Sequence, residues 1–146
     1  MAAELWINGD TGEICIGDVV PLQPNQTKGS IEPLIADFLD GSRDHGNGFE
    51  WLYLRRLTFG GQPAALSICF HDGRLEQASW SVQLPDAPTE GGWPTRETID
   101  RELSFVRETL ARDMNIHAGH MPWGEVWSSF DAKGFMAANG LRYRPV

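Results

Sequence analysis

The sequence predicts an α+β fold, in which an antiparallel meander sheet of roughly five to seven strands carries one long helix on one face, together with one short helix. Three observations favour this class. Short apolar runs are separated by Asn-Gly, Asp-Gly and Lys-Gly motifs, which suit hairpin turns. Residues 75–84 alternate between apolar and polar side chains. Residues 95–115 carry an apolar stripe with helical periodicity.

The first third of the chain predicts a hairpin followed by a short helix. Residues 5–7 and 13–17 contain apolar runs on either side of an Asn-Gly dipeptide, which tolerates positive φ in a tight turn. A helix is expected over residues 30–39, because Ser30 is a favoured N-cap and a proline is tolerated in a first turn. Its apolar side chains recur at helical spacing: Ile31, Leu34, Ile35 and Phe38.

A polar segment and a three-strand meander come next. Residues 40–48 are rich in Gly, Asp, Asn and Ser, which predicts a surface loop. Residues 50–59, 64–70 and 75–84 predict three strands joined by a Gly-Gly turn and an Asp-Gly turn. The third strand has one apolar and one polar face, which is typical of a sheet covered on one side only. The apolar set is Ala78, Trp80, Val82 and Leu84, and the polar set is Ser79, Ser81 and Gln83.

The last third predicts a long helix and a final hairpin. Residues 85–94 form a connection rich in Pro and Gly, and the helix of residues 95–115 needs an apolar surface for its stripe. We therefore expect this helix to cover one face of the sheet. Residues 125–130 and 135–143 predict a hairpin around an Asp-Ala-Lys-Gly turn. Neither an internal repeat nor a linker divides the sequence, so residues 1–146 are expected to form one domain.

Charge and composition restrict the classes of partner. The 146 residues include 12 Lys and Arg against 20 Asp and Glu, with a formal net charge of −8. A protein that grips a phosphate backbone normally shows a basic stripe, so we expect no nucleic-acid partner. The charge favours a basic protein partner, and it also serves plain solubility.

Three features predict a cytoplasmic location without a membrane partner. No run approaches the roughly 18 apolar residues of a membrane span. The first residues lack the basic and apolar segments of a secretory signal. Cys15 and Cys69 lie in apolar runs and are interpreted as buried free thiols, as in a reducing compartment.

The strongest catalytic candidates are the four histidines, and two of them are also weak metal candidates: His45, His71, His117 and His120. His117 and His120 have a metal-compatible spacing, with Asp113 nearby. Zinc sites need three or four protein ligands, and the sequence offers no further pair beside these two. They are therefore interpreted as surface-loop histidines and remain weak metal candidates.

No catalytic residue and no cofactor is predicted. His71-Asp72 falls in a tight turn, where Asp is favoured for its own local hydrogen bonds, and Asp44-His45 falls in the polar segment. No nucleophile elbow, phosphate-binding loop or dinucleotide motif is present. The carboxylates of the long helix lie off its apolar stripe and are interpreted as a solvated face: Asp100, Glu102 and Glu108.

The tryptophans suggest binding. Trp127 alternates with Val126 and with Phe130 along its strand, so it should lie on the open face if those two face the helix. Exposed Trp side chains anchor partners, although a satellite hydrophobic cluster is the plainer explanation. The predicted partner-binding residues are Trp127, Asp44, His45, Trp93 and Trp123.

The C-terminal hairpin carries a resemblance. Residues 123–131 match the pattern Trp-Gly-x-Val-x-Ser-x-x-Asp after a long helix, and residues 70–75 form a similar upstream turn. This pattern resembles small bacterial α+β proteins of unassigned function, and such acidic proteins are similar to the immunity partners of bacterial toxins. The resemblance implies a hairpin fold and a toxin-like partner, and it transfers no functional residues.

Three functions follow as expectations. The preferred one is an acidic cytosolic protein-binding domain, with an immunity-type inhibitor of a basic partner as its narrower form. The second is a small metal-dependent or hydrolytic enzyme that uses His45, His117 or His120. The third is a homo-oligomeric structural module that forms a homodimer through the open sheet face.

Overall fold

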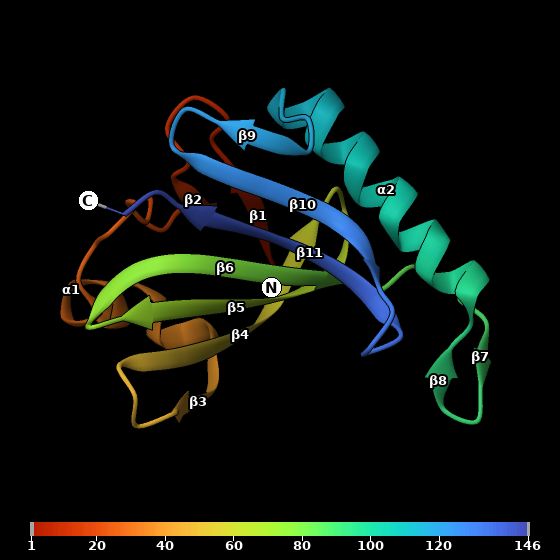
Figure 1. Ribbon diagram of the computed structural model, residues 1–146, viewed down its shortest axis with the longest axis horizontal. Helices are drawn as coiled ribbons and strands as arrows, with labels where there is room; N and C mark the ends of the chain where they lie inside the picture. Colours follow the sequence, from red (N-terminus) through yellow and green to blue (C-terminus); the bar gives the residue numbers. More distant parts are fainter. Residues whose placement is uncertain (1, 146) are drawn as a thin grey trace.

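The computed structural model describes residues 2–145, which form a curled sheet with two helices (Figure 1). The strands are β1 (Ala3–Ile7), β2 (Ile14–Ile16), β3 (Leu39–Asp44), β4 (Phe49–Phe59), β5 (Gln62–His71), β6 (Arg74–Val82), β7 (Thr89–Glu90), β8 (Trp93–Pro94), β9 (Gly119–Met121), β10 (Gly124–Asp131) and β11 (Met136–Tyr143). The helices are α1 (Lys28–Ile35) and α2 (Arg96–Met114), with a 3₁₀ turn η1 (Ala36–Phe38) after α1. The α+β class is confirmed.

The main sheet has nine strands, in the order β2-β1-β4-β5-β6-β11-β10-β9, with β3 beside β4. This exceeds the predicted five to seven. Two antiparallel meanders, β4 to β6 and β9 to β11, are joined because β11 pairs with β6. β1 pairs with β4 in parallel. The prediction of one antiparallel meander is therefore correct only locally.

Two-residue turns build the predicted central meander. Gly60 and Gly61 join β4 to β5 with φ of 58° and 85°, and Asp72 and Gly73 join β5 to β6 with φ of 50° and 79°. Positive φ at both central positions is the geometry whose twist matches that of the flanking strands. Glycine and aspartate tolerate it, so the sequence motifs predict these turns correctly.

The sheet curls until its first hairpin meets its last. β4 carries a bulge near Arg56, whose φ is 63°, and pairs with β3 before the bulge and with β1 after it. The β1–β2 turn then contacts the C-terminal hairpin. Trp123 Nε1 donates to the Gly9 carbonyl at 2.9 Å, and the buried Tyr143 hydroxyl donates to the Gly12 carbonyl. These two bonds close the curl around the core.

α2 lies on the covered face, along β10 and β11 (Figure 1). Thr95 caps its start by accepting a hydrogen bond from the Thr98 amide at 3.2 Å, and Asn115 ends it in the left-handed region with φ of 54°. The predicted helix of residues 95–115 is confirmed. Its predicted stripe is buried: Ile99, Leu103, Val106, Leu110 and Met114.

α1 begins earlier than predicted. Its N-cap is Thr27 rather than Ser30, because the Lys28 amide donates to the Gly73 carbonyl at 2.9 Å and ties the start of the helix to the β5–β6 turn. Pro33 consequently lies inside the helix and not in its first turn. The remainder of the predicted helix is the 3₁₀ turn η1.

Three β elements, namely β3, the β7–β8 hairpin and β9, lie where loops were predicted. The first half of the predicted loop 40–48 belongs to β3, which pairs along the edge of β4 and is anchored by an ion pair of 2.6 Å between Asp40 and Arg55. β7 and β8 form a small hairpin within the predicted connection 85–94. β9 places His120 on a strand instead of in a loop. All three elements form through backbone hydrogen bonds, and their sequences lack the apolar alternation that predicts a strand.

One buried cluster fills the curl, with side chains from the covered faces of the strands and from both helices. Cys69 is buried and Cys15 is half-buried, both are free thiols, and burial raises the pKa of each. Neither helix among residues 2–145 is long and apolar enough to cross a membrane.

Candidate functional site

The uncovered face of the sheet carries a row of side chains that crosses five strands. The register pairs Tyr53 with Ser67, Ser67 with Ser79, Ser79 with Gly140, and Gly140 with Trp127. Two aromatic side chains therefore stand at the ends of the row, with three small residues between them. A strand spacing of roughly 4.8 Å places these ends about 19 Å apart.

Trp127 lies against the backbone of β11. A Cβ atom on Gly140 would come within 2.6 Å of Trp127 Cζ2 and 2.8 Å of the Ala78 carbonyl oxygen. Only glycine leaves room for the indole here, and an aromatic side chain packed over a glycine of the neighbouring strand stabilises such a pair. Trp127 is half-buried in this position, and its alternation with the buried Val126 confirms that it lies on the open face.

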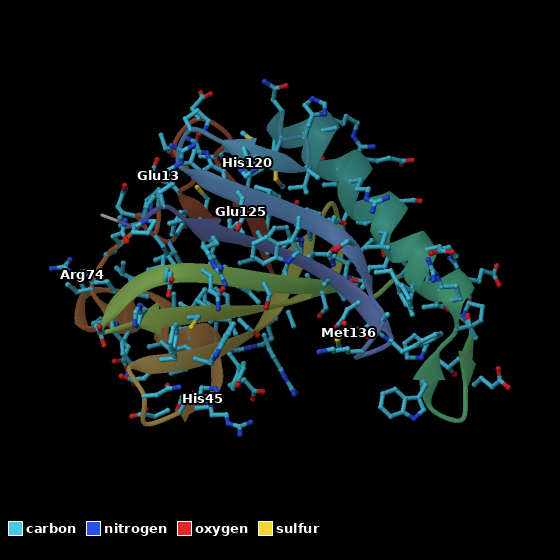
Figure 2. The ribbon with its side chains drawn as sticks, viewed as in Figure 1. Glu13, His45, Arg74, His120, Glu125 and Met136 are labelled. Atoms are coloured by element: carbon cyan, nitrogen blue, oxygen red, sulfur yellow. The ribbon has the colours of Figure 1, made fainter. Side chains whose placement is uncertain are left out.

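A pocket of about 280 Å³ opens on this face beside Trp127. Its floor is made of small residues from β5, β6 and β11, and Met136, half of whose surface is exposed, borders it. Figure 2 shows Met136 near the β10–β11 turn. The lining residues are Ala65, Ser67, Ser79, Trp80, Ser81, Trp127, Met136, Ala137, Ala138 and Asn139.

A second row beside the first carries larger and charged side chains. Trp51 pairs with Cys69, Cys69 with Gln77, Gln77 with Arg142, Arg142 with Glu125, and Glu125 with His120. Arg142 donates to the Gln77 side chain at 3.2 Å. Figure 2 shows Glu125 and His120 on neighbouring strands. The open face is thus polar and charged on one side of Trp127 and lined by small residues on the other.

The other predicted partner-binding residues do not converge on Trp127. Asp44 and His45 lie at the β3–β4 turn, where Asp44 accepts a hydrogen bond from the Gly46 amide at 2.8 Å, and Figure 2 places His45 away from Glu125 and Met136. Trp93 is 67% exposed on the β7–β8 hairpin. These residues define separate surfaces.

Trp123 is held by contacts within the fold. Its indole nitrogen donates to Gly9, its ring contacts Tyr143 edge-on with centroids 5.8 Å apart, and Gly12 packs beneath it. These contacts form the satellite hydrophobic cluster that was the alternative to a binding site. The cluster accounts for the position of Trp123, but it does not include Trp127.

The weak metal candidates, His117 and His120, are both exposed. Within residues 2–145, no three His, Cys, Asp or Glu side chains come together as a metal site would require. His120 instead faces Glu125 across the β9–β10 pair.

Glu102 differs from its interpretation as a solvated carboxylate. Its Oε2 accepts hydrogen bonds from the Val82 amide at 3.2 Å and from Asn139 Nδ2 at 2.9 Å. Asn139 in turn accepts from the Ser128 hydroxyl at 2.8 Å and donates to the Trp80 carbonyl. Burial raises the pKa of the Glu102 carboxyl, and it outweighs the two hydrogen bonds, which lower the pKa.

Sequence reasoning missed Tyr53, Trp51 and the small floor residues. Tyr53 and Trp51 alternate with the buried Leu52 and Leu54, so the signal that located Trp127 also applied to them. The small residues of the floor carry no such signal, because they align only through the register of distant strands.

Comparison with known proteins adds no relative: no family model, no curated protein and no solved structure matches this chain.

Proposed function

We propose that this chain is a protein-binding domain that docks a basic partner on the open sheet face around Trp127. The observation that carries the proposal is the row from Tyr53 to Trp127, in which a tryptophan lies over a glycine beside a pocket on a face that neither helix covers. Side chains of both helices contact the opposite face, as Glu102 of α2 and Lys28 of α1 do through Asn139 and Glu50.

The chemistry of the row suits a protein contact. Tryptophan is enriched at the energetically dominant positions of interfaces, where it contributes a large apolar area and one donor. Small residues beside it allow a partner segment to approach the sheet closely. The hydroxyls of Ser67 and Ser79 form no hydrogen bond with another residue of the described chain, so they are available to that segment.

The charge of the protein supports a basic partner. Besides the net charge of −8, a groove of about 670 Å³ along α2 is lined by three carboxylates and one cation around Leu84 and Phe105: Glu97, Asp100, Glu108 and Arg101. Charge of one sign steers an oppositely charged partner during association, and the rate gained this way falls with ionic strength. An immunity-type inhibitor in the cytoplasm, which masks a basic toxin, is the narrower form of the proposal and is supported by the resemblance of the C-terminal hairpin.

Affinity capture from the native host tests the proposal. Wild-type protein, Trp127→Ala and Trp93→Ala are immobilised in parallel, and bound proteins are compared at low and high salt. We expect the wild type and Trp93→Ala to capture one basic protein, and Trp127→Ala to capture much less of it. The amount captured should fall as the salt concentration rises.

Two outcomes would contradict the proposal. One is equal capture by wild type and Trp127→Ala, which would remove the open face as the docking surface. The other is a homodimer in light scattering that Trp127→Ala converts to a monomer, which would assign the same face to self-association.

A further inference from the structure

A separate pocket of about 290 Å³ lies between the end of β6, the connection that contains the β7–β8 hairpin and the first turns of α2. Glu102 is the single ionisable side chain among the residues that line it. The other lining residues are Ser81, Val82, Gln83, Leu84, Ala87, Thr89, Gly92, Pro94 and Thr98. The volume is near the lower end of the range for small-molecule sites, which begins at about 300 Å³.

The Glu102 carboxylate is held in a fixed orientation. Its Oε2 accepts from the Val82 amide and from Asn139, and Asn139 is itself fixed by Ser128 and by the Trp80 carbonyl. Side chains whose partners are themselves hydrogen-bonded lose little freedom when they bind a ligand. This network, which spans four elements, therefore presents one preorganised carboxylate to the pocket.

Glu102 has no cationic partner within the described chain. None of the ion pairs among residues 2–145 includes it, and its Oε1 accepts no hydrogen bond from them. A half-buried carboxylate without a cation carries an uncompensated desolvation cost, which appears here as a raised pKa. A positive group in the pocket would offset that cost.

We propose that this pocket binds one cationic group, an alkylammonium or a guanidinium, which pairs with Oε1 of Glu102. The alkyl stem lies against Val82, Leu84 and Pro94, and the charge lies at the carboxylate. The same chemistry is offered by a free amine and by a Lys or Arg side chain of a protein. The site adjoins the proposed docking face, because Ser81 lines both pockets and Asn139, which holds Glu102, also lines the pocket beside Trp127. It is a different site, because Glu102 reaches its pocket from α2 and does not line the pocket beside Trp127.

Carbon-detected NMR of the Glu102 carboxyl provides the test. Wild-type protein is titrated with n-butylammonium and n-butylguanidinium chloride, with 1-butanol as the uncharged probe of similar shape. We expect saturable shifts with both cations, weaker or absent shifts with 1-butanol, and a Glu102 titration that moves to lower pH when a cation is bound. Sodium chloride at equal ionic strength controls for screening.

Two variants sharpen the test. Glu102→Gln retains the size of the side chain and removes its charge, and we expect it to weaken cation binding by at least about tenfold. Asp37→Asn removes one exposed carboxylate that lines neither this pocket nor the groove along α2, and we expect it to bind as wild type does. If Glu102→Gln does not fold, the titration of Glu102 in the wild type decides alone.

The remaining arm identifies the source of the cation. An acetylated, amidated Gly-Lys-Gly peptide that binds as tightly as n-butylammonium assigns the pocket to a protein side chain, and exclusion of the peptide assigns it to a free amine. The proposal is overturned if 1-butanol shifts Glu102 as strongly as the cations do, if Glu102→Gln binds them equally, or if no saturable shift occurs.

Discussion

The two faces of the same strands differ in almost every physical property. On the covered face, Leu66 and Ile68 of β5 are at most 1% exposed, while Ser67 between them lies on the open face. Likewise β10 buries Val126 and presents Trp127. Alternation along one strand thus separates residues that determine stability from residues that are free to make contacts.

The polar groups of the two faces also differ. On the covered side, Asn139 and Ser128 are buried, and each forms side-chain hydrogen bonds within the network of Glu102. On the open side, the hydroxyls of Ser67 and Ser79 face solvent without a partner in the described chain. Buried polar groups are usually hydrogen-bonded within the protein, whereas polar groups that face solvent can bond to water or to a partner protein. Among the described residues, Trp80 Nε1 and the Thr109 hydroxyl are buried on the covered side without a hydrogen-bond partner, so the pairing on that side is extensive without being complete.

The largest expected effect tests the covered face. Leu141→Ala removes a side chain with no exposed surface from the centre of the core and should lower the free energy of unfolding by about 3 kcal/mol. The neighbouring Arg142→Ala lies on the open face, and its effect should stay within about 1 kcal/mol. Denaturant unfolding of both variants measures this difference. Similar losses for the two would remove the distinction between the faces.

Gly140→Ala tests the contact between Trp127 and the backbone. The new methyl group would overlap Trp127 Cζ2 and the Ala78 carbonyl, so we expect a loss of about 2 kcal/mol and a change in indole fluorescence as Trp127 moves. Gly29→Ala is the matched control, because nothing lies within 4 Å of its Cβ position in α1. That control should be neutral or slightly stabilising. An unchanged stability for Gly140→Ala would show that Trp127 does not lie over this glycine.

Tyr143→Phe tests the closure of the curl. The buried hydroxyl donates to the Gly12 carbonyl, and its removal leaves that acceptor unpaired, which should cost about 1 kcal/mol. Burial also raises the pKa of the Tyr143 phenol, so the hydroxyl remains neutral into strongly alkaline solution. Thermal unfolding of the variant, with hydrogen exchange at the β1–β2 turn, measures the effect. Unchanged exchange at that turn would argue against the role of this bond.

The smallest expected effect is a pH dependence. Because the folded pKa of Glu102 is raised above its ordinary value of 4.5, its contribution to stability is complete below about that pH and is lost as pH rises through the folded pKa. The stability of wild type relative to Glu102→Gln should therefore decline as pH rises from 4.5 and then level off. A difference in unfolding free energy between the two proteins that stays constant across this pH range would contradict the raised pKa of Glu102.

Local signals account for the parts of the fold that could be predicted. Two-residue turns with positive φ, the alternation of β6 and the stripe of α2 are each encoded within a few neighbouring residues. The position of β11 beside β6 and the parallel contact of β1 with β4 are not, because they depend on surfaces that meet only after folding. β3 was missed because its side chains are all exposed and carry no pattern.

The same limit applies to the candidate sites. Alternation along β10 is enough to place Trp127 on the open face. The small residues beside it come together only because β10, β11 and β6 pair in a particular register, which local sequence does not reveal. Glu102 lies off the apolar stripe of its helix, which is typical of a solvated residue. It is half-buried, and Asn139 on a distant strand hydrogen-bonds its carboxylate. Only the tertiary structure reveals that contact.

The most direct test of the docking face is the affinity of the captured partner for three proteins. If the open face is the docking surface, Trp127→Ala should raise the dissociation constant by roughly 30-fold, equivalent to about 2 kcal/mol at an interface hot spot. Trp93→Ala, equally aromatic but on the β7–β8 hairpin, should leave it within about twofold. Unchanged affinity for Trp127→Ala, or a loss confined to Trp93→Ala, would contradict the account.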